Sequence, residues 1–309
     1  MCSGPTKEGV ETSHPLLMLS VSSYGKTAPP LTSFFATCSV ICMFLLAAEM
    51  TVRAFFFNIK HLEPVLEDET NRHILSRHIG VDTMSCLIVS YMGWTARHIM
   101  QEMYDAVMLG RNNPKAMSKE GYEKRIFQYY PETARICVMF FAYQTKNMYD
   151  TIVWDDGPEF IFHHVLSMCV AWGAMYPGCA QFYGPFYLGM SEISTAVLCI
   201  LANFDEPPAG VTGLADAYPI TKVTVGAIFV TLFIICRCII WPMCSYYFIR
   251  DCNWTFENKT HAMLTPSRGR WIRGLQWCLS GLSILQVAWL GQIFLLGKAE
   301  LVKMGWIEE

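Results

Sequence analysis

Two adjacent histidines, His163 and His164, lie about one helical turn inside an apolar stretch of the chain. A short segment joins this stretch to the preceding one, so we expect two antiparallel helices with Asp150 at the depth of the histidines. A carboxylate beside an imidazole fixes its tautomer and orientation. His163, His164 and Asp150 are therefore predicted to form a general-base site. The alternative is that the histidines cap a helix at the level of the lipid headgroups.

Four polar residues share one face of the preceding stretch. Lys146 follows Tyr143 by three residues and Asn147 follows it by four. Asp150 comes four residues after Lys146 and three after Asn147. This spacing places all four on one stripe of a helix, where they must face other helices or water. The stripe predicts a ligand-binding surface, and the alternative is a structural ion pair between Lys146 and Asp150 at i, i+4.

A further carboxylate, Glu192, stands near the middle of another apolar stretch, with Thr195 three residues later. Inside a membrane a carboxylate must be protonated, paired or hydrated. Arg237 in the next stretch is the expected partner, because it lies within roughly one to two helical turns in depth. These three residues are predicted to bind a ligand or to form a structural pair. Glu49 and Arg53 are expected to form a second internal pair.

The composition is that of an integral membrane protein. Hydrophobic residues make up 53% of the 309-residue chain and charged residues 16%, against about 25% charged in a typical soluble domain. The net charge of -3 gives no argument for a nucleic-acid partner. The 13 cysteines lie mostly in apolar stretches and form no C-x-x-C pair, so we expect small buried side chains and no metal site.

Other membrane classes fit the sequence poorly. The double histidine stands alone, whereas a di-iron oxygenase needs several histidine clusters. Lys298 lies only at the end of the last apolar stretch, whereas a retinal protein needs a lysine in its middle. The acidic-Arg-aromatic and Asn-Pro-x-x-Tyr motifs of a G-protein-coupled receptor are missing from the sequence.

The apolar stretches predict an all-α, polytopic membrane bundle. A helix needs roughly 20 mostly apolar residues to cross a bilayer, and a six-span bundle is the alternative to seven. The predicted domains are a flexible N-terminal tail over 1–30, a transmembrane domain over 31–300 and a short C-terminal tail over 301–309. The seven predicted spans are Phe34–Phe57, Ile79–His98, Ala134–Val153, Phe160–Tyr176, Tyr183–Asn203, Val223–Ile249 and Leu275–Leu296.

Several residues bear on the shape and orientation of this bundle. We expect Pro242 to kink the sixth predicted span, and Gln286 and Gln292 to line a cavity or to bond between helices. Basic residues in the loops at 101–131 and 250–273 favour a cytoplasmic location for both loops and for the N-terminus. Glycosylation sequons at Asn253 and Asn258 favour the opposite orientation, so the orientation stays open.

The order of these motifs resembles the TLC-domain family, which includes the ceramide synthases. His163-His164 opens one helix, Glu192-Ile193-Ser194-Thr195 follows about thirty residues later, and Arg237 lies in the next helix. The resemblance covers roughly Phe34 to Glu300. Ceramide synthases carry a further His-Asp motif in the helix after the double histidine, whereas Met190 to Thr195 contain neither residue. The chain therefore resembles the TLCD-type branch of the family.

The resemblance implies six helices around a central lipid-accessible cavity, with one further helix at the N-terminus. We expect helix breaks at Pro177, Pro185 and Pro242 to help shape this cavity. It implies a multi-pass protein of lipid metabolism or lipid homeostasis that binds a long-chain lipid or acyl group. Membrane lipids are the expected partners. The endoplasmic reticulum is the favoured location, and other endomembranes or the plasma membrane are alternatives.

Whether the protein is an enzyme stays open at this point. One hypothesis is an acyltransferase like ceramide synthase, with His163 or His164 as base, Asp150 as its aid, and Lys146 or Arg237 stabilising negative charge. It would need no cofactor, but acyl-CoA as co-substrate. The other hypothesis is a non-catalytic lipid-binding or lipid-regulating protein, and the missing His-Asp motif favours it.

Overall fold

The computed structural model describes residues 28–107, 117–205, 209–257, 263–303 and 305. Every regular element in these ranges is helical, which confirms the all-α prediction. Nearly all of the predicted tail over 1–30 lies outside the described residues, as does the sequon at Asn258. The last helix continues to Lys303, past the predicted end of the membrane domain at residue 300.

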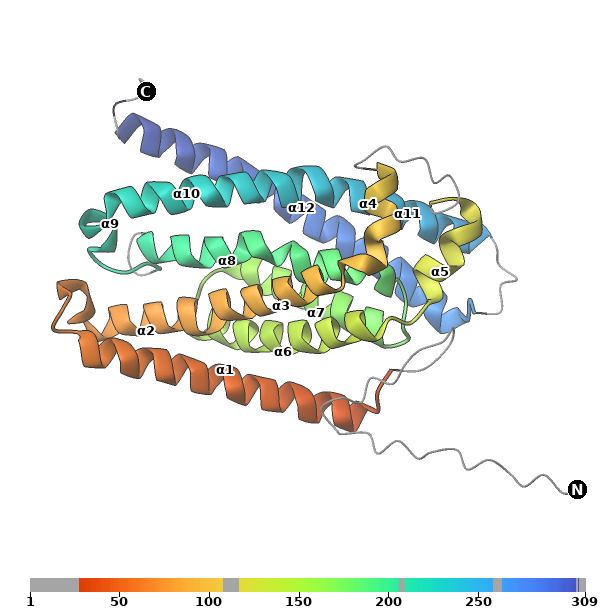
Figure 1. Ribbon diagram of the computed structural model, residues 1–309, viewed down its shortest axis with the longest axis horizontal. Helices are drawn as coiled ribbons and strands as arrows, with labels where there is room; N and C mark the ends of the chain where they lie inside the picture. The colour runs from red at the N-terminus through yellow and green to blue at the C-terminus, as the bar shows by residue number, and fades with distance from the viewer. Residues whose placement is uncertain (1–27, 108–116, 206–208, 258–262, 304, 306–309) are drawn as a thin grey trace, which may run out of the picture.

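Each predicted span lies within or largely within a long helix or run of helices, and shorter helices connect them (Figure 1). Most of the runs extend beyond the apolar stretches. The α-helices are α1 (Leu31–Ile59), α2 (Glu69–Arg77), α3 (Met84–Thr95), α4 (Gln101–Val107), α5 (Tyr122–Phe127), α6 (Pro131–Trp154), α7 (Pro158–Met175), α8 (Glu192–Leu201), α9 (Leu214–Ala217), α10 (Pro219–Phe233), α11 (Trp241–Glu257) and α12 (Pro266–Lys303).

Four helices in the described residues are long and apolar enough to cross a membrane. The runs formed by α2 and α3, by α6 and by α7 are less apolar, because they carry polar residues such as Asp82, Lys146 and His164. Four is thus the number that helix length and composition support. The four spans are Leu31–Ile59, Phe186–Phe204, Pro219–Glu257 and Pro266–Val302.

Wider π-helical turns interrupt three of the helical runs within the described ranges, at His78–Thr83, Phe186–Met190 and Ile234–Ile240. The first contains Asp82, the second ends just before Glu192, and the third contains Arg237. Pro242 follows the third turn, where its missing N–H removes an ordinary helical hydrogen bond. The helix nevertheless continues as α11. Such turns commonly occur at functional sites, and here they accompany buried charges.

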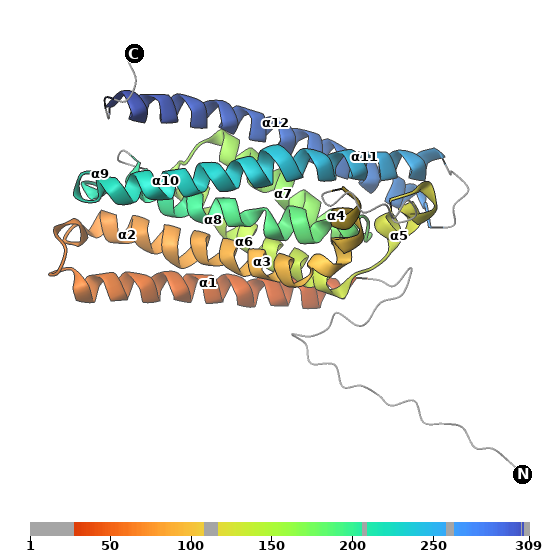
Figure 2. The same ribbon diagram turned by 45° about the horizontal axis from the view of Figure 1, so that its top comes forward.

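The long helices lie side by side, with α1 along one edge and α12 at the opposite face (Figures 1 and 2). The main core cluster is drawn largely from α6, α7, the turn before α8, α11 and α12. The start of α1 lies at the same end as α5 and the end of α11 (Figure 1). This arrangement puts the described basic residues of both loops at one end, as expected for a common side of the membrane.

Candidate functional site

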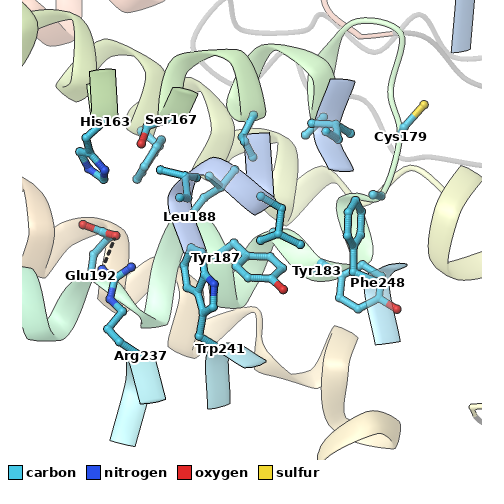
Figure 3. Close-up of a pocket in the computed structure, with 18 residues that line it drawn as sticks. His163, Ser167, Cys179, Tyr183, Tyr187, Leu188, Glu192, Arg237, Trp241 and Phe248 are labelled. Atoms are coloured by element: carbon cyan, nitrogen blue, oxygen red, sulfur yellow. Dashed lines mark hydrogen bonds and ion pairs between the residues drawn. The ribbon is translucent and has the colours of Figure 1, made fainter. Parts of the chain in front are cut away.

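A pocket lies between α7, the helical run that leads into α8, α11 and α12, and it is amphipathic (Figure 3). Its volume is about 50 Å³. His163, Glu192 and Arg237 lie at one end, and Tyr183 and Phe248 lie at the other (Figure 3). The remaining lining residues are mostly apolar: Phe140, Ser167, Val170, Ala174, Cys179, Ala180, Gly184, Tyr187, Leu188, Trp241, Leu275, Leu279 and Leu282.

The Glu192 carboxylate and the Arg237 guanidinium form the expected ion pair, with 3.0 Å between Oε1 and an Arg237 nitrogen. The same nitrogen donates to the Ser191 carbonyl and the Thr195 hydroxyl, both at 3.1 Å. The guanidinium also lies 5.2 Å from the centre of the Trp241 ring. Both charged side chains are 6% exposed, so this charge is compensated inside the protein rather than by water.

His163 is the histidine that lines the pocket. Its Nδ1 atom is buried and has no hydrogen-bond partner among the described residues. The ring packs edge-on against Trp289 of α12, with 5.3 Å between ring centres. A buried imidazole nitrogen without a partner is costly, and it is available to a ligand that enters the pocket.

His164 points elsewhere, as expected for adjacent residues on one helix. Its Nδ1 atom lies 2.5 Å from the Gln144 side-chain oxygen, and its Nε2 atom lies 3.2 Å from the Thr151 hydroxyl. Both partners belong to α6, so His164 ties α7 to α6. The hydrogen bonds of the two histidines in the described residues do not include Asp150, and the predicted carboxylate–imidazole contact is not formed.

Asp150 instead belongs to a second polar group, the Lys146 cluster, which consists of Glu49, Lys146 and Asp150. The Lys146 ammonium lies 2.5 Å from an Asp150 oxygen and 2.9 Å from a Glu49 oxygen. This confirms the structural pairing of Lys146 with Asp150. The predicted pair between Glu49 and Arg53 is wrong, because Glu49 turns toward α6 while Arg53 pairs with Glu69 at 2.8 Å.

Tyr143 connects the stripe on α6 to the Glu192 region. Its hydroxyl lies 3.1 Å from the Cys86 thiol, which donates to the second oxygen of Glu192 over 3.9 Å. The side-chain oxygen of Asn147 is buried and has no partner among the described residues. Neither Tyr143 nor Asn147 lines the pocket described above. Of the nine predicted site residues, His163, Glu192 and Arg237 line the pocket. Thr195 and Tyr143 connect to the Glu192–Arg237 pair, and Lys146 and Asp150 form the Lys146 cluster. His164 bonds to α6, and Asn147 joins none of these groups.

The far end of the pocket rests on a charged group that the sequence pattern did not predict. Asp251 of α11 is fully buried, and it accepts two hydrogen bonds from Arg125 at 2.5 and 2.8 Å. The Tyr183 hydroxyl donates to the same carboxylate at 2.6 Å. Arg125 and Asp251 are 126 residues apart, so no local spacing points to their contact. This group fixes α5, α11 and the Tyr183 segment together.

Other pocket residues follow from helical spacing. Ser167 comes four residues after His163, and Trp241 comes four residues after Arg237, which places each on the face of its predicted neighbour. Tyr187 precedes Glu192 by five residues, a spacing that faces the same way only because the π-helical turn lies between them. That turn is not visible in the sequence.

The chemistry of metals and thiolates finds little support at this site. No group of three or more potential metal ligands occurs within the described ranges. Cys179 lines the pocket, but burial raises the pKa of its thiol to about 12. A neutral thiol of this kind is a poor nucleophile. His163 and the Glu192–Arg237 pair are the candidate reactive or ligand-binding groups of the pocket.

Comparison with protein families identifies a TLC domain over residues 32–295, which is most of the chain. The protein therefore belongs to the TLC-domain family, as the motifs around His163, Glu192 and Arg237 indicated. Together with its long apolar helices, this makes it a membrane protein of that family. Comparisons with curated proteins and with solved structures find no match.

Proposed function

We propose that the protein acts in lipid homeostasis or lipid metabolism by binding the polar end of a long-chain lipid or acyl group in the pocket. The observation that carries this proposal is the division of the pocket into a charged end, with His163, Glu192 and Arg237, and a remainder lined mostly by apolar side chains. A lipid has the same division.

The proposal includes a seven-helix membrane topology in which six helices surround the pocket and α1 packs outside. The less apolar runs would cross the bilayer with their polar residues turned inward, as the Lys146 cluster does. We place the protein in the TLCD-type branch because the His-Asp motif of ceramide synthases has no counterpart between Met190 and Thr195. We favour the endoplasmic reticulum as its location.

The size of the pocket sets how a ligand would sit. A volume of about 50 Å³ holds a headgroup-sized set of atoms but not a whole acyl chain. The polar end of the lipid would therefore lie near His163, while the chain would separate the apolar side chains of α7, α11 and α12. Leu275, Leu279 and Leu282 of α12 are the side chains that would move first, because leucine has several accessible rotamers.

The unpartnered nitrogen of His163 also supports a second candidate, an acyltransferase that uses acyl-CoA. His163 would accept the proton of an attacking hydroxyl or amine as a new bond forms to the thioester carbon. The carbon–sulfur bond would then break, and the departing CoA thiolate would take up that proton. Lys146 does not line the pocket, and the charge of Arg237 is already compensated by Glu192, so neither offers an uncompensated positive charge to the intermediate. We therefore favour the binding function.

The lipids that copurify with the protein test the proposal. Wild type and Ser167→Leu would be purified in mild detergent, and their lipid extracts would be compared by mass spectrometry. Ser167 lines the pocket, so the larger side chain should fill it and reduce the bound lipid class several-fold. Ser280→Leu on the exposed face of α12 is the matched control. Equal lipid content in all three folded proteins would refute a lipid site in this pocket.

A further inference from the structure

Helix α12 presents a buried stripe with one polar member. Ile272, Leu275, Leu279, Leu282 and Gln286 follow one another at intervals of three and four residues, and all are at most 6% exposed. This spacing places them on one face of the helix. All three leucines of this stripe line the pocket. The stripe thus runs along the pocket and ends on a glutamine where a further leucine would fit the pattern.

The Gln286 amide is buried without hydrogen bonds. Its oxygen and its nitrogen are both enclosed, and neither has a partner among the described residues. Burying an amide in this way is unfavourable, and proteins usually satisfy nearly all such groups. A leucine at this position would avoid the cost, so the glutamine serves something other than packing of the lipid-free protein.

Gln286 lies on α12 close to the residue that contacts His163. Gln286 lies one turn beyond the pocket-lining Leu282 and three residues before Trp289. The Trp289 ring packs against the His163 ring, so this part of α12 faces the polar end of the pocket. His163 brings an unpartnered ring nitrogen, and Gln286 brings one unpartnered oxygen and one unpartnered nitrogen. Gln286 does not itself line the pocket, but it lies on the same face of α12 as Leu282, next to the end that His163 forms. Two helices therefore carry unused hydrogen-bonding groups close to this end of the pocket.

The charges at this end of the pocket are already balanced. Glu192 and Arg237 pair with each other, and no other carboxylate, ammonium or guanidinium group lines the pocket within the described ranges. An ionised headgroup would lose its hydration and find no opposite charge left to compensate it. A neutral group that both donates and accepts hydrogen bonds would match the amide of Gln286.

We propose that His163 and Gln286 form a subsite for a neutral hydrogen-bonding group of the lipid, a hydroxyl or an amide, rather than for a carboxylate, a phosphate or an ammonium group. The inference rests on the proposed lipid-binding function and specifies its ligand. The Gln286 amide hydrogen-bonds to this group, and the apolar side chains of the stripe contact the hydrocarbon chain of the lipid. Gln286 then contributes to binding, at the expense of stability in the lipid-free protein.

The test uses four probes with the same chain: hexadecanol, hexadecanamide, hexadecanoate and hexadecylamine. Each is titrated into delipidated full-length protein in detergent while the melting temperature is followed. The variant is Gln286→Leu, and the control is Gln292→Leu on an exposed face of the same helix. Partition of each probe into the micelles is the same for both proteins, so a difference between them reports the site.

We expect the two neutral probes to bind wild type at least tenfold more tightly than the two charged ones. Gln286→Leu should weaken binding of the neutral probes about five- to tenfold, which corresponds to one lost hydrogen bond. The same variant should raise the melting temperature without probe, since it removes an unpaired buried amide. Gln292→Leu should change neither property. A purely structural glutamine would not give this combination of greater stability and weaker binding.

Two results would overturn the inference alone: charged probes that bind as tightly as neutral ones, or a Gln286→Leu protein with a lower melting temperature and unchanged affinities. Either can occur while Ser167→Leu still loses its copurified lipid, so the proposed function would stand. If wild type binds none of the four probes and carries no copurified lipid, both the inference and the proposed function are refuted.

Discussion

The ion pair between Glu192 and Arg237 gives an asymmetric prediction. Glu192→Gln keeps the size of the side chain but leaves the Arg237 charge without its carboxylate partner. An arginine cannot give up its proton, so the charge persists in the core. Arg237→Met leaves Glu192 instead, and a buried carboxyl group can take up a proton and become neutral. We therefore expect Glu192→Gln to be the more destabilising of the two.

The magnitude follows from the burial of the pair, whose side chains are both 6% exposed. Removing one partner of a buried ion pair costs about 3 to 5 kcal/mol, which we expect for Glu192→Gln. Arg237→Met should cost about 1 to 3 kcal/mol, mainly through lost hydrogen bonds to Ser191 and Thr195. The double variant should cost less than the sum of the two, because it leaves no unpaired charge.

Chemical unfolding of the purified protein in detergent measures these differences. The control is Glu257→Gln, which breaks the 2.6 Å pair with Lys119, where both side chains are 57% exposed. This change should cost less than about 1 kcal/mol. Additive costs in the double variant, or a loss in Glu192→Gln as small as in the control, would refute the claim that the pair is enclosed and desolvated.

Three further predictions concern packing and the division of roles. Gly93→Ala should destabilise the protein by about 1 to 3 kcal/mol, because the new methyl group would lie 2.5 Å from backbone atoms of the facing helix. Gly291→Ala places its methyl group in open space, so this control should be neutral or slightly stabilising. Thermal unfolding compares the two variants. Tyr183→Phe should cost about 1.5 to 3 kcal/mol by the same assay, since it removes a hydrogen bond to a buried carboxylate, and an unchanged melting temperature would contradict that role. His164→Ala should lower stability by about 1 to 3 kcal/mol, whereas His163→Ala should leave it nearly unchanged and lose lipid binding; the reverse pattern would contradict the assignment.

The sequence was informative about pairs that follow from helical spacing. Lys146 and Asp150 share a face of one helix, and their pairing is confirmed. Glu192 and Arg237 could be paired because a charge at membrane depth needs a counter-charge and few are available. The all-α class followed from apolar stretches of helical length, and family membership followed from the order of the motifs.

The sequence was uninformative wherever the contact depends on how helices rotate against one another. Glu49 has Arg53 one turn away, yet it faces Lys146 on another helix. The difference between His163 and His164 likewise depends on the rotation of α7, which spacing alone does not give. Arg125 and Asp251 show a third limit, because neither belongs to a motif that points to an ion pair, although both are buried. Packing selects among contacts that local spacing leaves equivalent.

The most direct test of the central claim is lipid mass spectrometry of membranes that contain wild type, His163→Ala or His164→Ala at matched levels of folded protein. The account predicts that wild type changes one lipid class and that His163→Ala abolishes this change. At the same level of folded protein, His164→Ala should retain this change. A lipid change that persists in well-folded His163→Ala would contradict a function centred on this pocket.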